Sequence, residues 1–292
     1  MIKKYFYFLF FLFFFLSSCN KVNYSTPKSD KKTNSVVLNN IKINKSNLVV
    51  IYGDTRNNYE VHRKIVSLFL EKNPAMVFNT GDLVYDGNIN ELWPIFLDII
   101  KPIIKTARYY PVLGNHERNS DNYFKIFNLP NNKKWYKIDF KNISFFVLDS
   151  NSDLGKKSKQ YLWLEEKLKK NKSDFKILIF HHPLFSVGRH GGSKYLQDNL
   201  NLLINQYNID IVFSGHDHAY ERFFKNNTHY VVTGGGGAPL YDKVDNSSDE
   251  KYLKKYIKDY HYCLLDIKGK KLDFKVYDIK NNLIDNIFIE KK

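Results

Sequence analysis

Asp, Asn and His side chains follow short apolar runs at five places in this sequence. Carboxylate, amide oxygen and imidazole, with no thiolate beside them, suit hard or borderline ions such as Fe, Mn or Zn. A carboxylate can also bridge two ions, and a pair of ions roughly 3.5–4 Å apart suits in-line displacement at phosphorus. The pattern therefore predicts a metal site for phosphoryl chemistry. The five places read Gly53-Asp54, Gly81-Asp82, Gly114-Asn115-His116, His181-His182 and Gly215-His216-Asp217-His218.

Each place has a plainer interpretation when it is taken alone. Gly-Asp after a strand is usually a turn in which the Asp caps the next helix, and His181-His182 would also suit a buried pair. His216 and His218 are stronger candidates, because alternate residues of an extended chain point the same way and can bind one ion. The five places together favour a functional site over coincidence.

The elements that must position these residues alternate between strand-like and helix-like patterns. Loops at the carboxyl ends of strands are where α/β folds build active sites, and each of the five places follows a predicted strand. The rest of the chain closes with antiparallel runs, so we expect one α/β domain over residues 46–292. Strands are predicted at 47–52, 75–79, 109–113, 176–180, 209–214 and 229–233, helices at 59–72, 160–170 and 193–207, a hairpin at 135–140 with 143–149, and three alternating runs within 260–290.

The first 45 residues are not expected to belong to that domain. Lys3 and Lys4 precede an apolar run at 5–16, which is too short to span a bilayer and is typical of a signal peptide. Leu16-Ser17-Ser18-Cys19 resembles a bacterial lipobox, whose cysteine is lipidated and becomes the new N-terminus; the alternative is an ordinary secreted protein. We expect a lipoprotein signal peptide at 1–18, a disordered tether at 19–45, and a protein lipid-anchored through Cys19 to the extracytoplasmic side of a bacterial membrane in the cell envelope.

Composition excludes several classes of protein. A hydrophobic content of 43% with 16% aromatic residues excludes a disordered chain, and two cysteines exclude a disulfide framework or a Cys-rich zinc module. The net charge of +15 comes largely from lysines scattered among asparagines, with no Arg-rich stripe. We therefore expect no nucleic acid partner.

The order of the five motifs resembles that of the calcineurin-like metallophosphoesterases, and within them the purple acid phosphatases. Gly-His-Asp-His-Ala-Tyr-Glu-Arg at 215–222 and Gly-Gly-Gly-Gly-Ala-Pro at 234–239 are similar to that branch in particular. The similarity covers residues 47–290. It implies an α/β fold, a four-layer αββα sandwich of two mixed β-sheets flanked by helices. It also implies hydrolysis of phosphate monoesters by a hydroxide that forms on two metal ions.

The same resemblance implies roles for individual residues. His116 would donate a proton to the leaving group or bind phosphate, and His190 would lie on the substrate side. Ferric iron is expected at the site that contains a tyrosine, with Fe(II), Zn(II) or Mn(II) at the other. By the resemblance the first ion would be held by Asp54, Asp82, Tyr85 and His218, and the second by Asp82, Asn115, His181 and His216.

Arg56 is a departure from the wider family. Many metallophosphoesterases carry a histidine ligand at this position; the purple branch lacks it and supplies a tyrosine, which matches Tyr85. Arg56 could bind substrate phosphate through its planar fork, or pair with a surface carboxylate.

Other function classes stay open at this point. The expected partner is a phosphorylated small molecule, but a phosphodiesterase or nucleotide pyrophosphatase would use the same metals. A lipid-anchored binding protein without catalysis is a further alternative. No oligomeric state is predicted.

Overall fold

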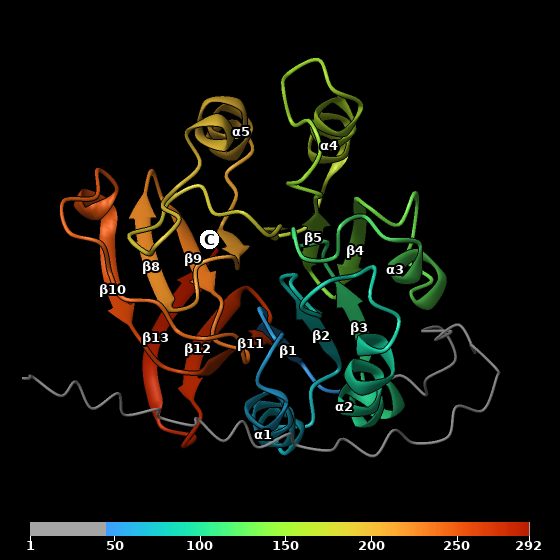
Figure 1. The fold of residues 1–292 in the computed structure, drawn as a ribbon. Coiled ribbons are helices and arrows are strands. Elements are labelled where there is room, and N and C mark those ends of the chain that lie inside the picture. Colours follow the sequence, from blue (N-terminus) through green and yellow to red (C-terminus); the bar gives the residue numbers. More distant parts are fainter. Residues whose placement is uncertain (1–44, 292) are drawn as a thin grey trace, which may run out of the picture. The chain divides into compact units, whose positions relative to one another are not determined.

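A computed structural model describes residues 45–291 of the chain. Within this range two mixed β-sheets pack against each other and helices flank them (Figure 1), which confirms the expected fold class. The expected signal peptide and nearly all of the expected tether fall outside the described residues. None of the helices between residues 45 and 291 has the length and apolar character that a membrane span needs.

The first sheet joins the two ends of the domain. Its three earliest strands are parallel, and β11 pairs antiparallel with β1, so the last part of the chain lies beside the first. The final three runs therefore form the antiparallel finish that the sequence predicted. The strand order is β13-β12-β11-β1-β2-β3, with β1 (Leu48–Tyr52), β2 (Met76–Asn79), β3 (Arg108–Pro111), β11 (His261–Lys268), β12 (Lys271–Asp278) and β13 (Leu283–Glu290).

The second sheet comes from the middle of the chain. Strands β5, β6, β7 and β9 run parallel, while β4, β8 and β10 pair antiparallel with their neighbours. The predicted hairpin is confirmed as β4 and β5. The order is β10-β8-β9-β7-β6-β5-β4, with β4 (Tyr136–Phe140), β5 (Ile143–Val147), β6 (Phe175–Ile179), β7 (Ile211–Ser214), β8 (Tyr220–Lys225), β9 (Thr228–Thr233) and β10 (Leu253–Ile257).

Aromatic side chains fill the space between the two sheets. The rings of Phe78 on β2 and Phe145 on β5 lie 4.7 Å apart, and those of Phe213 and Phe274 lie 5.7 Å apart. Burial of such large apolar surfaces stabilises the contact between the sheets. The site described below draws residues from both sheets, so this core fixes its geometry.

The helices cover the outer faces of the sheets. In Figure 1, α1 and α2 lie beside the first sheet, and α4 and α5 lie beside the second. The sequence did not predict α2, which contains Pro94 and Pro102, because proline usually ends a helix. Here Pro94 falls in the first turn, and five apolar side chains of α2 are buried and hold the helix against the sheet. The helices are α1 (Tyr59–Leu70), α2 (Leu92–Thr106), α3 (Asp121–Ile126), α4 (Lys159–Lys170) and α5 (Lys194–Gln206), with a 3₁₀ turn η1 (Glu250–Tyr252).

Candidate metal centre

The five motifs meet where the two sheets present the carboxyl ends of their parallel strands. Asp54, Asp82 and Asn115 follow β1, β2 and β3 of the first sheet, whereas His181 and His216 follow β6 and β7 of the second. A hydrogen bond joins the loops of the two sheets, because the backbone N–H of His216 donates to the side-chain oxygen Asp54 Oδ2 at 3.0 Å. The structure therefore brings together motif residues that lie as far apart in the sequence as Asp54 and His218.

Unusual backbone conformations hold these side chains in place. Asp54, Asp82 and His216 have φ values of 57°, 56° and 71°, a region that residues other than glycine seldom adopt. Gly81 shows how closely the loops approach, since a Cβ atom there would lie 2.7 Å from the backbone nitrogen of Gly114. Such strain concentrates at functional sites, where the surrounding structure compensates for it.

The second set of expected ligands is a group of facing acceptor atoms. His181 Nε2 lies 3.0 Å from Asn115 Oδ1 and 3.3 Å from Asp82 Oδ1. His216 Nδ1 lies 3.1 Å from Asn115 Oδ1 and 3.2 Å from His181 Nε2. His181 Nδ1 donates to the carbonyl of Thr80 at 2.9 Å, so its Nε2 carries a lone pair. We refer to these four residues, Asp82, Asn115, His181 and His216, as the second ligand set.

Electrostatics favour a cation within the second ligand set. Burial lowers the pKa of His181 well below its usual value and that of His216 to about 2, so both imidazoles are neutral. The lone pairs of His181 Nε2, Asn115 Oδ1 and Asp82 Oδ1 lie about 3 Å apart, and a positive centre between them, or in part a proton on His216 Nδ1, satisfies them. An ion with bonds of about 2.0–2.2 Å would satisfy such a group, and the residues present therefore fit a metal.

The first ligand set consists of Asp54, Asp82 and His218, together with Tyr85 as expected from the sequence. His218 Nε2 lies 3.6 Å from Asp54 Oδ1. Asp54 is completely buried, and burial together with the neighbouring Asp82 raises its pKa well above the usual value. A buried carboxylate pair of this kind needs a nearby positive charge to remain ionised.

Arg56 supplies a positive charge at this point. Its Nε lies 3.3 Å from Asp82 Oδ2 and its Nη2 lies 3.4 Å from His218 Nε2. The expected alternative of a surface carboxylate partner is wrong, because Asp82 is only 1% exposed.

Tyr85 lies at the edge of this arrangement. Its side chain is 55% exposed, and its ring centroid lies 5.6 Å from that of His116. The main-chain carbonyl of Tyr85 accepts a hydrogen bond from His116 Nδ1 at 2.5 Å. The structure thus gathers Asp54, Asp82 and His218 around Arg56 and leaves the Tyr85 side chain largely facing solvent.

His216 and His218 do not face one common point. The positive φ of His216 breaks the extended chain on which a shared ion for this pair would depend. The assignment of the two histidines to different ions, which the family resemblance implies, stays a prediction. The His216 ring lies 4.4 Å from that of His190, whereas the His218 ring stacks on Tyr241 with centroids 4.1 Å apart. Each histidine therefore serves a different ligand set.

A cleft of about 210 Å³ opens in front of both sets. His116 Nε2 lies 3.8 Å from Asp82 Oδ2 at its wall. Arg189 and His190, both exposed, bring further basic groups to it. The cleft is lined by Arg56, Asp82, Asn115, His116, Arg189, His190, His216 and Tyr241.

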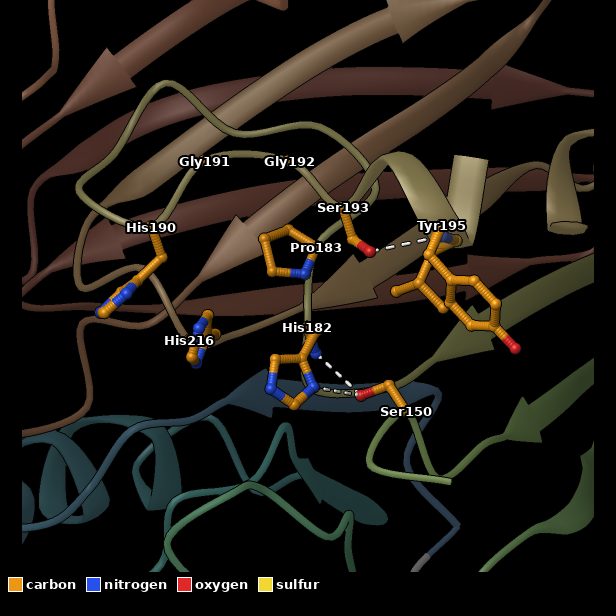
Figure 2. Close-up of a pocket in the computed structure, with 10 residues that line it drawn as sticks. Ser150, His182, Pro183, His190, Gly191, Gly192, Ser193, Tyr195 and His216 are labelled. Atoms are coloured by element: carbon orange, nitrogen blue, oxygen red, sulfur yellow. Dashed lines mark hydrogen bonds between the residues drawn. The ribbon is translucent and has the colours of Figure 1, made fainter. Parts of the chain in front are cut away.

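A second cavity of about 270 Å³ adjoins the cleft and shares His190 and His216 with it. Figure 2 shows His182 between His216 and Ser150 in this cavity, with Ser150 Oγ 2.8 Å from His182 Nδ1. Gly191, Gly192 and Ser193 form the opposite wall. The cleft and the cavity therefore meet at His190 and His216.

A buried acidic network holds the loop that carries Arg189 and His190. Ser186 Oγ donates to Asp217 Oδ2 at 2.6 Å and lies 3.0 Å from Glu221 Oε1. The backbone N–H of His190 donates to Asp217 Oδ1 at 2.9 Å. Burial raises the pKa of Glu221 to about 8, so near neutral pH a proton is retained within the network.

The sequence analysis assigned no individual role to three residues that shape the site. Glu117 is completely buried and accepts hydrogen bonds from three backbone N–H groups of the surrounding loops. His182 belongs to a cluster with His181 and His216 that has metal-binding geometry. Glu117 and His182 stand beside expected ligands in the sequence, which could have drawn attention to them. Nothing in the sequence around Tyr241 indicates a place in the site, because only the fold brings its ring onto His218.

Comparisons with known proteins agree with this architecture. Residues 48–220 match the family of calcineurin-like phosphoesterases. Purple acid phosphatase 7 of Arabidopsis thaliana is 23% identical over 249 residues, which cover 74% of this chain and 76% of that protein. Probable inactive purple acid phosphatase 1 of the same plant is 28% identical over 265 residues, covering 72% of this chain but 43% of its own length.

A solved structure gives the same result for the fold. The purple acid phosphatase PPD1 from yellow lupin (Lupinus luteus) seeds superposes with a TM-score of 0.76 at 21% identity. The match covers 83% of this chain and 53% of the lupin chain, so the chain spans about half the length of that protein.

Proposed function

The chain belongs to the calcineurin-like phosphoesterase family, and from this premise we propose that it hydrolyses phosphate monoesters with the help of bound metal. Members of this family are built around a dinuclear metal centre. The observation that carries the proposal is the second ligand set, whose facing acceptor atoms lie at the wall of an open, basic cleft. Monoesters are favoured by the acid phosphatases among the relatives.

Metal held by these ligands would supply Lewis-acid polarisation of a phosphoryl oxygen and a lower pKa for a water molecule. The residues of this chain would bind and orient the substrate. Arg56, Arg189 and His190 attract and orient the phosphate dianion by charge and hydrogen bonds. Asp82 and Asn115 hold their acceptor atoms toward the same point from neighbouring loops.

His116 is placed to move a proton. Its Nδ1 donates to the Tyr85 carbonyl, so the exchangeable position is Nε2, which lies 3.8 Å from the Asp82 carboxylate. A protonated Nε2 at the wall of the cleft can protonate the departing alcohol oxygen.

Phosphodiester hydrolysis is the second candidate. The cavity of about 270 Å³ beyond His190 and His216 would take a second ester group. A nucleotide pyrophosphatase would use the same space. A binding protein without catalysis is a less favoured alternative, because every residue of the second ligand set is present, although some relatives are named as inactive.

Iron and the membrane anchor belong to the proposal only as predictions from the sequence. Ferric iron bound by Tyr85, with Fe(II), Zn(II) or Mn(II) as its neighbour, stays a prediction. So do lipidation of Cys19 and a place on the extracytoplasmic side of a bacterial membrane.

The test compares two chromogenic substrates. The full-length protein is stripped with a chelator, reloaded with Zn(II), Mn(II) or iron, and assayed with p-nitrophenyl phosphate and with bis(p-nitrophenyl) phosphate. We expect faster hydrolysis of the monoester, lost on chelation and in Asn115→Ala but kept in Asn88→Ala, an exposed asparagine outside the cleft. A faster diester reaction would select the second candidate. No hydrolysis with any of these metals would defeat the proposal.

A further inference from the structure

The two ligand sets differ in one respect: a positively charged hydrogen-bond donor, the guanidinium of Arg56, lies within the first set. Within the second ligand set, His181 Nε2 and the side-chain oxygens of Asn115 and Asp82 face one another as acceptors, and a backbone N–H, that of His116, donates to Asp82 Oδ1. In the first set the Arg56 guanidinium lies against both Asp82 and His218. Its side chain is only 10% exposed, so this is a buried position.

The lone pair of His218 is already used. His218 Nδ1 donates to the carbonyl of Pro239 at 2.7 Å, so the proton of the neutral ring is on Nδ1 and the lone pair is on Nε2. Arg56 Nη2 lies 3.4 Å from that Nε2 and can only donate to it. One in-plane lone pair cannot serve a guanidinium and a metal ion at the same time.

The two oxygens of Asp82 divide between the two sets. Oδ1 faces His181 Nε2 at 3.3 Å and accepts the backbone N–H of His116 at 3.0 Å. Oδ2 faces Arg56 Nε at 3.3 Å. Asp82 therefore bridges the second ligand set and a guanidinium.

Charge and anchoring keep Arg56 there. The guanidinium is always protonated and compensates the buried carboxylates of Asp54 and Asp82. A cation of charge two or three at the same point would be repelled by it. The loop itself is fixed, since the N–H of Thr55 donates to the carbonyl of Asp82 at 3.0 Å. Removing the side chain from this position would leave buried acceptors without a partner.

We infer that Arg56 takes the position of the first ion in this chain, so that the centre binds one metal ion at the second ligand set and uses the guanidinium as its second cation. The inference deepens the proposed function and rests on it for its catalytic meaning. Because Arg56 also lines the cleft, its remaining N–H groups can bind phosphoryl oxygens beside that ion. The solvent-facing side chain of Tyr85 agrees with a first position that needs no phenolate.

Metal stoichiometry tests the inference without depending on turnover. The full-length protein is stripped, loaded with excess Zn(II), freed of unbound metal by gel filtration, and its zinc is counted by mass spectrometry. We expect one zinc per chain in the wild type and two in Arg56→Ala or in Arg56→Gln, which keeps the length of the side chain without its charge. Adding His218→Ala to Arg56→Ala should return the count to one.

Two controls separate this effect from general loss of charge. Arg189→Ala removes another cation of the cleft, whose guanidinium lies over the Tyr241 ring, and should stay at one zinc per chain. Asn115→Ala in the wild-type background should bind less than one, because it removes a member of the second ligand set.

Any of three results would overturn the inference. The first two are two zinc ions in the wild type and one zinc ion in folded Arg56→Gln. The third is a visible charge-transfer band in iron-loaded wild type that Tyr85→Phe removes, because that band requires an ion at the first position. An inactive protein with one zinc per chain would contradict the proposed function and support the inference. An active protein with two zinc ions per chain would support the proposed function and contradict the inference.

Discussion

Oε2 of Glu117 accepts the backbone N–H of Asp82 at 3.0 Å. The same oxygen accepts the N–H of Gly114 at 2.6 Å, and Oε1 accepts that of Leu83 at 2.7 Å. Glu117 therefore ties the loop after β2 to the loop after β3, and these loops carry the Asp82 and Asn115 side chains. Burial and the neighbouring Asp82 raise the pKa of Glu117 to about 8, whereas the three N–H donors act in the opposite direction. The three contacts themselves are those of an ionised carboxylate, which has no proton to turn toward a donor.

We expect Glu117→Gln to destabilise the protein by roughly 1–3 kcal/mol, because the amide group would turn a donor toward backbone donors that are buried. Zinc affinity should fall with it, since the loops of two ligands lose their common anchor. Urea unfolding and zinc titration measure the two effects. Glu60→Gln, on the exposed face of α1, is the matched control and should change neither. Unchanged stability and affinity in Glu117→Gln would refute the anchoring role.

His116→Ala should keep its metal and lose roughly 10²–10⁴-fold in rate on substrates with poor leaving groups. The loss should be smaller on a nitrophenyl ester, whose leaving group needs little protonation. Rates on an alkyl and a nitrophenyl phosphate, with the metal content of the same samples, provide the measurement. Equal losses on both substrates would argue against proton donation.

The raised pKa of Glu221 predicts that the free energy of unfolding depends on pH. Burial raises its pKa from the ordinary 4.5 to about 8 in the folded protein. Between these values the folded state holds a proton that the unfolded chain has released. Its stabilising contribution is therefore complete below about pH 4.5 and declines as the pH rises to about 8, by up to about 1.4 kcal/mol per unit.

Glu221→Gln removes this titration and keeps the shape of the side chain. The variant can still accept from the backbone N–H of Val187 and can donate to Ser186. We expect its urea midpoint to change less than that of the wild type between pH 5 and 8, at a fixed metal content. Parallel curves for the two proteins would show that Glu221 does not retain the proton.

Cys19→Ala tests the predicted anchor. If Cys19 carries the lipid, this substitution should move the protein from the membrane fraction to the soluble or secreted fraction. Cys263→Ala is the control, since that cysteine is buried in the domain. Membrane association that survives Cys19→Ala would contradict the lipoprotein interpretation.

Local patterns predicted most of the elements but not their division between two sheets. The runs that became β1 and β6 read alike, as short buried apolar segments, and nothing in either run says which sheet it joins. The strand β8 was missed because its first three residues belong to the motif at 215–222, which was interpreted as a chemical motif and not as a structural element.

The sequence predicted some parts of the site better than others. The residues of the second ligand set meet as expected, because each follows directly after a strand end. The place of Arg56 could not be predicted, since it depends on Asp82 and His218, which arrive from different sheets. Tyr85 lies three residues after Asp82, but the direction of its side chain depends on the loop that Glu117 anchors.

The pairing of Ile51 with Cys263 in the first sheet has a consequence for the order in which the protein is made. β1 is among the first elements to leave the ribosome, and β11 is among the last. Until β11 is present, one edge of β1 has no neighbouring strand. The loop that carries Asp54 is also held by the hydrogen bond from the Gly236 N–H to the Gly53 carbonyl, and the loop of Gly236 is in turn held by the hydrogen bond from the His261 N–H to the Gly235 carbonyl. Long-range pairing of this kind is slow to form. A chain whose synthesis is halted early should therefore acquire its metal only after its last strands are released.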